Sequence, residues 1–564
     1  MNGIKAGYRT KIRIVLVLTL VLLIMNGCSN RKDNTVSDTA SPDASASGQS
    51  TKQATMKPKS KISVSVYDRG NVPAAEGTID DSRWSKWINA NGPANVEFVP
   101  IPRWESLPKL NTLFASGSAP DLIFEFDAKI RNQFLAQKQF MPIDDMVSKS
   151  VEYKKFLEQN PGVKKLAMNE DGKMHYFGRV VGPTLNVGLV IREDWLGNLG
   201  LKSPTTPEEL VAVAKAFTER DPDGNGKKDT FGYHLSFIGG GIIDRMYNSG
   251  EIPDGMLLNN GELVRQWDNS KAALQLKKQL FDAGTIDKDF LTDKGEKALQ
   301  DFVNGKLGIY GINNINSVNG AGYKNFETLR KNNPNAKIKF IPFPTTVYGS
   351  YSWGWEPIQL IAAVNAKAKN PQAVMDYMDF LTKDSTQLSL TYGVENEHWK
   401  MGEDSCPKQI DPAKSKAEVD YNGDFRMQAN IGIGLLAKCA QPEKVYDAKV
   451  PLQKEYMDLQ LQQAKPAYLN PERPFNGFTA SGYNPALPQD LSAFSAQLTQ
   501  SISDIFNKAI VSGASYSVDQ AINDAKTAWS KGSGDKIEAW YKDWYAKNKD
   551  KIYTTAEIYK QYVK

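Results

Sequence analysis

The stretch NVEFVPIPRWESLPKLNTLFASGSAPDLIFEF, residues 95–126, decides the fold class of this chain. Its two ends, residues 95–102 and 121–126, are rich in the β-branched and aromatic residues that favour strands. Between them, residues 104–117 carry apolar side chains at helical spacing and end in a glycine. A strand, a helix and a second strand at this spacing predict a parallel sheet in an α/β fold.

Further strands and helices follow the same patterns along the chain. Residues 61–67 alternate apolar and polar side chains as a strand does, and residues 187–201 predict a buried strand followed by a short helix. Thr206 and Pro207 start a helix in which Glu209 completes a capping box. Other predicted elements are a helix ended by Gly305 and then a strand, a strand entering a loop within 357–368, a helix begun by Asn370 and Pro371, and a helix-rich C-terminal third.

The N-terminus, residues 1–28, has the features of an export signal. Basic residues precede an apolar run, 14–25, that is too short to span a bilayer comfortably. The run ends just before Cys28, as in a bacterial lipoprotein signal, and we predict that Cys28 is lipidated; an ordinary secretory signal with an incidental cysteine is the alternative. Residues 29–60 are rich in Ser, Thr, Ala and Asp and predict a flexible tether. We therefore expect the body to work at the extracellular face of the bacterial cell membrane, held there by its lipid.

Composition narrows the possible partners of the body. The net charge is only +5, with basic and acidic residues interleaved, so no nucleic-acid partner is implied. Three widely scattered histidines argue against a His-based zinc site. Cys406 and Cys439 could form a disulfide in an oxidising compartment, and the sequence leaves that pairing open.

One loop, DPDGNGKKDT at 221–230, concentrates acidic and turn-forming residues. Oxygen ligands at its positions 1, 3 and 5, with a backbone carbonyl at 7, suit Ca²⁺. The predicted metal residues are Asp221, Asp223, Asn225, Lys227 and Asp229. A complete EF-hand would carry Glu at position 12, which here is Gly232, and the glycine spacing of a phosphate-binding loop is missing. A solvated turn without metal remains the alternative.

These pieces, in this order, resemble the extracellular solute-binding proteins of bacterial ABC importers, and especially the carbohydrate-binding members that include maltodextrin- and alginate-oligosaccharide-binding proteins. The resemblance covers roughly residues 60–560. The motifs that carry it are KLNTLFASGSAPDLIF (109–124), DGKMHYFGR (171–179), VIREDWLGNLGLKSPTTPEEL (190–210), FVNGKLGIYG (302–311) and AVNAKAKNPQAVMDYMDFL (363–381). Each motif is modest by itself, and their common order makes the resemblance specific.

The resemblance implies an α/β, two-lobed periplasmic-binding-protein-like fold of type II, with lobes joined by crossing strands. Lobe 1 would comprise residues 61–186 and 357–440, and lobe 2 residues 187–356 and 441–564. The implied function is capture of an oligosaccharide between the lobes and its delivery to the permease subunits of an ABC importer, by a monomer without catalytic activity. A surface-tethered polysaccharide hydrolase or lyase, and a sensory binding protein for a membrane kinase, are the alternatives.

The resemblance also extends to the 221–230 loop, which is similar to the structural calcium loop of oligosaccharide-binding proteins in this family. In those loops the next residue can be an acidic ligand, whereas here it is Thr230. We therefore expect structural Ca²⁺ that pins a helix end to the next strand, with its final ligand in question.

Candidate ligand residues follow from how proteins bind sugars, by aromatic faces together with carboxylates, amides and arginines placed after the ends of strands. In the first half of the chain these are Tyr67, Arg103, Trp104, Glu125 and Asp127. In the second half they are Arg245, Asn313, Asn314, Trp353, Trp355, Glu356, Glu395, His398 and Trp399. We expect Trp84, Trp87, Trp195, Trp540 and Trp544, which fall on helical stretches, to be packing residues.

Overall fold

The computed structural model describes residues 58–182, 184–249, 255–259, 261–316, 320–354, 356–429, 432–474, 485 and 487–563. Residues Pro58–Lys564 form one compact unit. The predicted signal segment with Cys28, nearly all of the predicted tether and Trp355 lie outside the described residues. Among the residues described, no helix combines the length and the apolar character that crossing a membrane requires.

The first sheet has the strand order β2-β1-β3-β10-β4. Its strands are β1 (Ser60–Asp68), β2 (Ala94–Pro102), β3 (Leu122–Phe124), β4 (Phe177–Val180) and β10 (Ile358–Val364). β1 runs parallel to β2 and to β3, with Tyr67 opposite Ile101 in the first pair. The predicted parallel strand, helix, strand unit is therefore confirmed, and α2 (Ser106–Ala115) is its helix. β10 makes the sheet mixed, because it pairs antiparallel with both β3 and β4.

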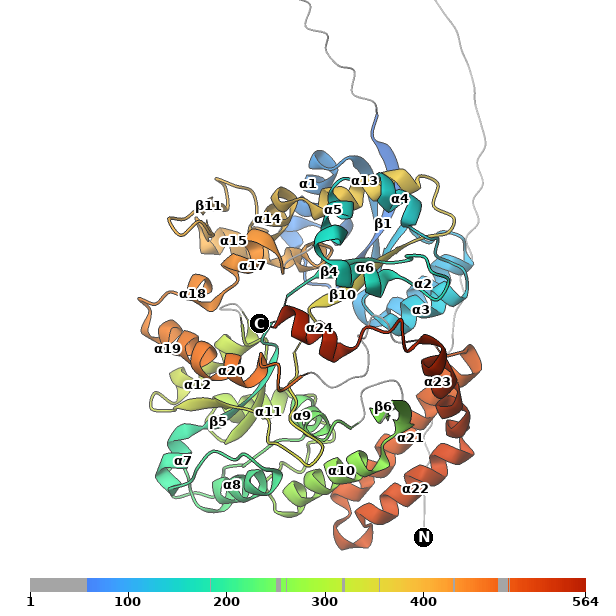
Figure 1. Ribbon diagram of the computed structural model, residues 1–564. Coiled ribbons are helices and arrows are strands. Elements are labelled where there is room, and N and C mark those ends of the chain that lie inside the picture. The colour runs from blue at the N-terminus through green and yellow to red at the C-terminus, as the bar shows by residue number, and fades with distance from the viewer. Residues whose placement is uncertain are drawn as a thin grey trace, which may run out of the picture. The chain divides into compact units, whose positions relative to one another are not determined.

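Helices pack around this sheet and complete a first core. The core draws on residues between Ile62 and Val180 and again between Ile358 and Ala429. Its helices are α1 (Arg83–Asn91), α3 (Ala128–Ala136), α4 (Asp144–Lys149), α5 (Glu152–Gln159), α6 (Pro161–Ala167), α13 (Pro371–Thr382), α14 (Asp384–Tyr392), α15 (Pro412–Glu418) and α16 (Gly423–Arg426) (Figure 1). Tyr553 and Ile558, which the sequence division assigns to lobe 2, also pack in this first core.

The second sheet has the order β8-β5-β9, and both pairs are antiparallel. Its strands are β5 (Val187–Arg192), β8 (Ile309–Asn313) and β9 (Ile338–Ile341). A second core forms around it, from residues between Leu185 and Phe343 and again between Tyr446 and Ile522. Its helices are α7 (Glu193–Leu199), α8 (Pro207–Glu219), α9 (Ile238–Met246), α10 (Trp267–Asp282), α11 (Glu296–Val303), α12 (Ala321–Asn332), α19 (Pro451–Leu459) and α20 (Lys465–Tyr468).

The C-terminal third is helical, as predicted. Helices α21 (Gln489–Val511), α22 (Val518–Lys531) and α23 (Gly534–Asn548) pack with the hairpin β6 (Met256–Asn259) and β7 (Glu262–Arg265) in a third core (Figure 1). Trp540 and Trp544 belong to this packing, and Trp84 and Trp195 are fully buried elsewhere, so the prediction that these tryptophans are packing residues is confirmed. Trp87 is half-buried against the first core. The last helix is α24 (Thr555–Tyr562).

The chain crosses between the two cores more than once, and the crossings are bonded to each other. The segment after β4 donates from Val181 N to Pro357 O at 2.8 Å, and Val187 N donates to Trp353 O at 3.2 Å. A third passage adds Gly432 N to Val180 O at 3.0 Å. The two sheets are therefore joined by paired extended segments.

Two helix starts differ in detail from the sequence interpretation. Thr206 caps α8 as predicted, by accepting from Glu209 N at 3.3 Å. The Glu209 carboxylate, however, reaches past the cap and accepts from Thr205 N and Oγ1, so the predicted capping box is wrong in its second half. Asn370 precedes α13, yet its side-chain amide donates to Lys61 O instead of capping the helix. In both cases a nearby backbone or hydroxyl group offers the side chain another partner.

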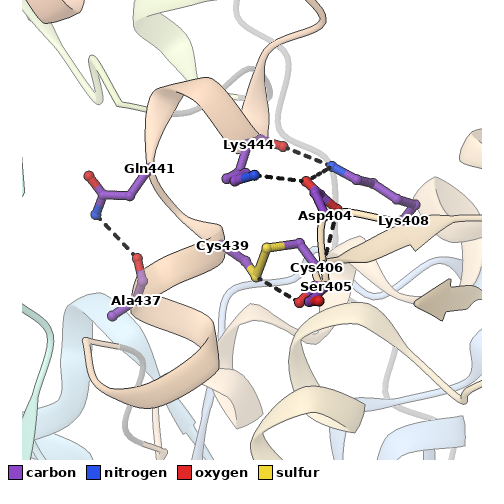
Figure 2. The surroundings of a disulfide bond; sticks show 8 residues. All are labelled: Asp404, Ser405, Cys406, Lys408, Ala437, Cys439, Gln441 and Lys444. Carbon is purple, nitrogen blue, oxygen red and sulfur yellow. Dashed lines mark hydrogen bonds and ion pairs between the residues drawn. A yellow bond between two sulfur atoms is a disulfide. The ribbon is translucent and has the colours of Figure 1, made fainter. Parts of the chain in front are cut away.

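The open question of the two cysteines is resolved by a disulfide between Cys406 and Cys439, whose Cα atoms lie 5.5 Å apart (Figure 2). It ties the hairpin of β11 (Trp399–Met401) and β12 (Pro407–Gln409) to α17 (Gly434–Cys439). Figure 2 shows Asp404 beside it, paired with Lys408 and Lys444.

Candidate functional site

A first group of predicted residues meets after the carboxyl ends of β1 and β2. The guanidinium carbon of Arg103 lies 4.8 Å from the ring centre of Tyr67 and 5.0 Å from that of Trp104. Trp104 is 82% exposed, and Arg103 has no ion-pair partner within the described part of the chain. An exposed indole beside an unpaired guanidinium can stack on a ligand ring and donate hydrogen bonds to oxygen atoms around that ring. We name this group, Tyr67 with Arg103 and Trp104, the first cluster.

Buried polar groups hold the Tyr67 side chain of the first cluster in place. The Tyr67 hydroxyl donates to Glu125 Oε1 at 2.8 Å and accepts from Phe126 N at 3.1 Å. Burial, reinforced by the Glu125 charge, raises the pKa of Tyr67, so the hydroxyl stays protonated. Arg131 donates to the backbone oxygen of Glu125, while Glu125 Oε2 is buried and has no partner among the residues described. Tyr67 and Glu125 therefore position the cluster, and Arg103 and Trp104 are its reachable members.

Two residues that sequence reasoning missed complete this region. Arg69 donates from Nε to both carboxylate oxygens of Asp424, at 2.9 and 3.1 Å. Its guanidinium carbon also lies 5.9 Å from the Trp104 ring centre. Burial raises the pKa of Asp424 although Arg69 opposes the shift. The position of Arg69 just after β1 could have marked it, whereas Asp424 is 355 residues away and carries no local signal.

A second group of predicted residues meets at one edge of the second sheet. The Arg245 guanidinium carbon lies 4.4 Å from the Trp353 ring centre. The same ring covers α9 at Gly241, where an added Cβ would lie 2.9 Å from it. Asn313 ends β8 opposite Val187, whose N–H donates to Trp353 O. Arg245, Asn313 and Trp353 therefore lie by the crossing segments, and we name them the second cluster.

Three further predicted residues, Asn314, Glu356 and Asp127, have no defined part in either cluster. Asn314 follows Asn313 with a positive φ of 49°, and Glu356 is half-buried in the crossing before β10. The Asp127 carboxylate caps α3 by accepting from Lys129 N at 2.8 Å. Trp355 lies outside the described residues, so its predicted role in ligand binding stays a prediction.

The remaining predicted residues, Glu395, His398 and Trp399, form neither cluster. Trp399 is buried and donates from Nε1 to Gly393 O at 2.8 Å. His398 is 1% exposed, and its Nδ1 accepts from Val394 N at 3.0 Å. Nε2 is then the protonated nitrogen, and it faces Glu418 Oε2 at 3.1 Å. Both rings thus have partners inside the protein, and Glu395 is an exposed residue of the same turn.

His398 also belongs to a group that could hold a metal ion, with Glu397 and Glu418. The two carboxylates are already neutralised by cations, since Glu397 pairs with Lys414 at 3.0 Å and Glu418 with Arg83 at 3.1 Å. These pairs describe an ion-pair network around the buried His398 ring, with its carboxylates and cations partly exposed.

In the 221–230 loop, hydrogen bonds connect the acidic side chains through Asn225 and the backbone. The Asn225 amide nitrogen donates to Asp223 Oδ2 at 2.8 Å and to Asp229 Oδ1 at 3.2 Å. The Asp221 carboxylate accepts from the backbone of Asn225 and Gly226. Burial raises the pKa of Asp223, and so do the nearby charges of Asp221 and Asp229 and the hydrogen bond that protonated Asp223 donates to Asp221. A hard divalent cation prefers oxygen ligands and neutralises neighbouring carboxylates. The carboxylates of this loop therefore fit Ca²⁺.

The same loop lacks a ligand at its far end. The Thr230 hydroxyl is buried and donates to Phe217 O of α8 at 2.7 Å, so it is turned into the protein. Position 12 is Gly232, which has no side chain and lies against the Ala214 backbone. The loop therefore supplies side-chain oxygens from Asp221, Asp223, Asn225 and Asp229 only.

Comparison with protein families gives one model match over residues 77–388, described as "Bacterial extracellular solute-binding protein". Among curated proteins, the chain is 28% identical over 303 residues to the polygalacturonan/rhamnogalacturonan-binding protein YtcQ of Bacillus subtilis. That match covers 52% of this chain and 59% of YtcQ. Matches to the other curated relatives span less than half of their lengths, at 43% and 25%.

Solved structures share the fold over most of the chain. FusA, an ABC-transporter substrate-binding protein of Streptococcus pneumoniae solved in complex with kestose, superposes with a TM-score of 0.61 at 18% identity, covering 87% of this chain and 99% of FusA. The alginate-binding protein AlgQ2, solved without calcium ion, gives 0.63 at 18% identity, covering 88% of this chain and all of AlgQ2. The predicted two-lobed α/β fold class is therefore confirmed.

Proposed function

Because the chain belongs to the bacterial extracellular solute-binding protein family, we propose that it captures an oligosaccharide between two lobes and delivers it unchanged to an ABC importer. The lobes are the parts built on the first and second cores, with boundaries near residues 186, 356 and 440, and the segment with Tyr553 and Ile558 returns to the first core. The paired crossing segments serve as the hinge. Hinge closure around a ligand needs two conformations that differ little in free energy, so that the importer can retrieve the cargo.

The observation that carries this proposal is the contact of Trp104 with Arg103 after the carboxyl ends of β1 and β2. Trp104 is 82% exposed, and contact of its apolar ring with water is unfavourable. A ligand or partner that covers the ring would therefore gain binding free energy. Its face suits the C–H surface of a sugar ring, and Arg103 adds donors for hydroxyl or carboxylate oxygens. YtcQ and FusA, named for pectic and fructose-based polymers or oligosaccharides, support saccharides as the ligand class.

We propose binding without bond cleavage. A glycosidase would need two carboxylates facing each other across the ligand, one of them poised as an acid. Two carboxylates near the first cluster are held by protein groups: Glu125 Oε1 accepts from Tyr67, and Asp424 accepts from Arg69. Their arrangement supports a rigid wall beside the ligand.

We also propose that the 221–230 loop holds structural Ca²⁺. The ion would be bound by the side chains of Asp221, Asp223, Asn225 and Asp229, with the backbone carbonyl of Lys227 as a further oxygen. It would fix the end of α8 to the segment that follows, and it would take no part in ligand binding. The hydrogen bonds that Asn225 donates to both Asp223 and Asp229 support this assignment, since they hold two carboxylates that a cation would neutralise on either side of one amide.

The N-terminal sequence supports a lipid anchor at Cys28 and a location at the extracellular face of the cell membrane. The disulfide between Cys406 and Cys439 agrees with that location, because disulfides persist in oxidising compartments. Globomycin-sensitive processing together with metabolic labelling by a fatty-acid analogue would test the anchor, and loss of label in Cys28→Ser is the expected result.

Calorimetric titration with oligogalacturonides, fructooligosaccharides and maltodextrins tests the ligand class. We expect wild-type protein to bind at least one series, and Trp104→Ala to lose ~2 kcal/mol of binding free energy, as a buried aromatic contact does. Phe494→Ala, which removes an exposed aromatic from α21, is the matched control and should bind as wild type does. Equal affinity in Trp104→Ala and wild type would remove the first cluster from the ligand site.

A further inference from the structure

Phe237, at the N-terminus of α9, combines two features that rarely occur together. Its side chain is 69% exposed, second only to Trp104 among the exposed aromatic residues in the described part of the chain. Its backbone has φ 47° and ψ −105°, a conformation that L-residues with a Cβ adopt only at a cost. Packing does not account for either feature, because an exposed ring gains little from burial.

The surrounding contacts hold this strained conformation in place. His234 Nε2 accepts from Gly311 N at 3.0 Å, which leaves the proton on Nδ1, 3.5 Å from Ser236 Oγ. Although burial opposes it, hydrogen bonds from the Lys297 backbone and the Ser236 hydroxyl lower the pKa of Asp293. This chain of bonds from β8 to the start of α11 fixes the residues just before Phe237.

A glycine supports the ring of Phe237 from one side. An added Cβ at Gly295 would lie 3.3 Å from Phe237 Cβ and 3.5 Å from its Cδ1. The absence of a side chain at Gly295 therefore lets the base of the phenyl group rest on the backbone, while most of the ring stays in solvent. The ring is held at its base and free at its face.

Phe237 lies at the edge of the second sheet that carries the second cluster. The segment before it runs alongside β8, since Phe231 pairs parallel with Leu307 and Ile309 N donates to Gly232 O. This direction leads towards the end of β8 marked by Asn313. One helical turn beyond Phe237, Gly241 lies under the Trp353 ring.

We propose that Phe237 is a ligand-contact residue of the second lobe, where its ring stacks on the C–H face of a saccharide unit. It is the counterpart of Trp104 on the first lobe. His234, Ser236, Asp293 and Gly295 are its positioning residues. The inference rests on the proposed function, since it assigns a further residue to the same oligosaccharide site. A ligand-contact role also accounts for the strained backbone of Phe237, because that conformation leaves the aromatic face exposed at this edge of the sheet.

Titration calorimetry of Phe237 variants tests this assignment with trigalacturonic acid, 1-kestose and maltotriose as probes. For each probe that wild type binds, we expect Phe237→Ala to raise Kd by roughly tenfold or more, as loss of an aromatic hot spot does. Phe237→Trp keeps an aromatic face and should stay within about threefold of wild type. Phe494→Ala is the control and should leave Kd unchanged.

The Tm of thermal unfolding is a second readout. A packing role of Phe237 and a ligand-contact role predict opposite changes in it. Phe237→Gly removes the strain at positive φ, so its Tm should equal or exceed that of wild type. A clear fall in Tm for Phe237→Gly would assign the ring to packing and overturn the inference. Wild-type affinity in Phe237→Ala would overturn it too, while leaving the proposed function intact. If wild type binds none of the probes, the proposed function fails and this inference fails with it.

Discussion

Removing the disulfide between Cys406 and Cys439 should destabilise the protein by an amount that the structure lets us calculate. The two cysteines are 33 residues apart in sequence, and closing a loop of that size removes ~13 cal/mol/K of entropy from the unfolded chain. At room temperature this corresponds to ~4 kcal/mol, a large part of the 5–15 kcal/mol that typically separates folded from unfolded protein. The ion pairs of Asp404 with Lys408 and Lys444 lie at the surface beside the bond and contribute far less.

Equilibrium unfolding in urea, followed by tryptophan fluorescence with and without reductant, measures this loss. With a slope of ~3 kcal/mol/M, the midpoint of the wild type should fall by about 1 M on reduction. The double variant Cys406→Ala with Cys439→Ala should match reduced wild type and should not respond to reductant. Asp404→Asn is the matched control for the neighbouring ion pairs and should leave the midpoint nearly unchanged. A reduction-dependent loss below ~1 kcal/mol in wild type would refute the loop-closure reasoning.

Three further changes should have measurable effects on stability. Chelation of Ca²⁺ should lower the Tm of wild type, by the equivalent of ~2.7 kcal/mol if the calcium concentration was a hundred times the Kd. The Tm of Asp223→Ala should not change on chelation. A wild-type Tm that is independent of calcium would contradict a metal loop. Burial lowers the pKa of His234 to about 4 from 6.5, so the unfolded chain takes up the proton first and stability should fall as the pH drops from 6.5 towards 4. Calorimetry across that range should show a loss approaching ~3 kcal/mol in wild type that is missing in His234→Gln. The charge of Asp293 opposes the shift and Tyr310 stacks on the ring; equal slopes of stability against pH in both proteins would refute the reasoning. Gly432→Ala should destabilise the crossing by ~1–3 kcal/mol in urea unfolding, because its Cβ would lie 2.1 Å from a facing backbone nitrogen, whereas Gly423→Ala meets open space and should be neutral.

Local periodicity predicted most of the fold. The spacing of Leu210, Val213, Ala214 and Phe217 predicted one buried helix face, and all four side chains are buried in α8. The alternating pattern of residues 61–67 likewise became β1. Such features depend on neighbours within a few residues, so the sequence contains the whole signal.

The candidate site was less predictable because its contacts join distant parts of the chain. Arg69 and Asp424 meet across 355 residues, and neither residue type is unusual where it stands. The positive φ of Phe237 occurs beside the hydrogen bonds of His234 and beside Gly295, and the neighbours of Phe237 in sequence do not reveal these contacts. Trp399 follows a polar turn, as an aromatic ligand residue would, yet its ring is buried beside Tyr392 and donates to Gly393 O.

The predicted capping box failed at the Glu209 carboxylate, where two possible hydrogen-bond partners compete. Glu209 was expected to bond to the cap of its own helix, and it bonds to Thr205 instead because that residue offers both an N–H and a hydroxyl. The family resemblance, by contrast, rests on the order of several motifs, and it placed the fold class correctly where single motifs are weak.

Saturation-transfer difference NMR on mixed oligogalacturonides, fructooligosaccharides and maltodextrins tests the central claim most directly, because one set of spectra reports binding and turnover together. We expect saturation transfer from the protein to at least one intact oligosaccharide, with no new anomeric signals after prolonged incubation. New anomeric or unsaturated-sugar signals, or the absence of transfer to every oligosaccharide, would contradict it.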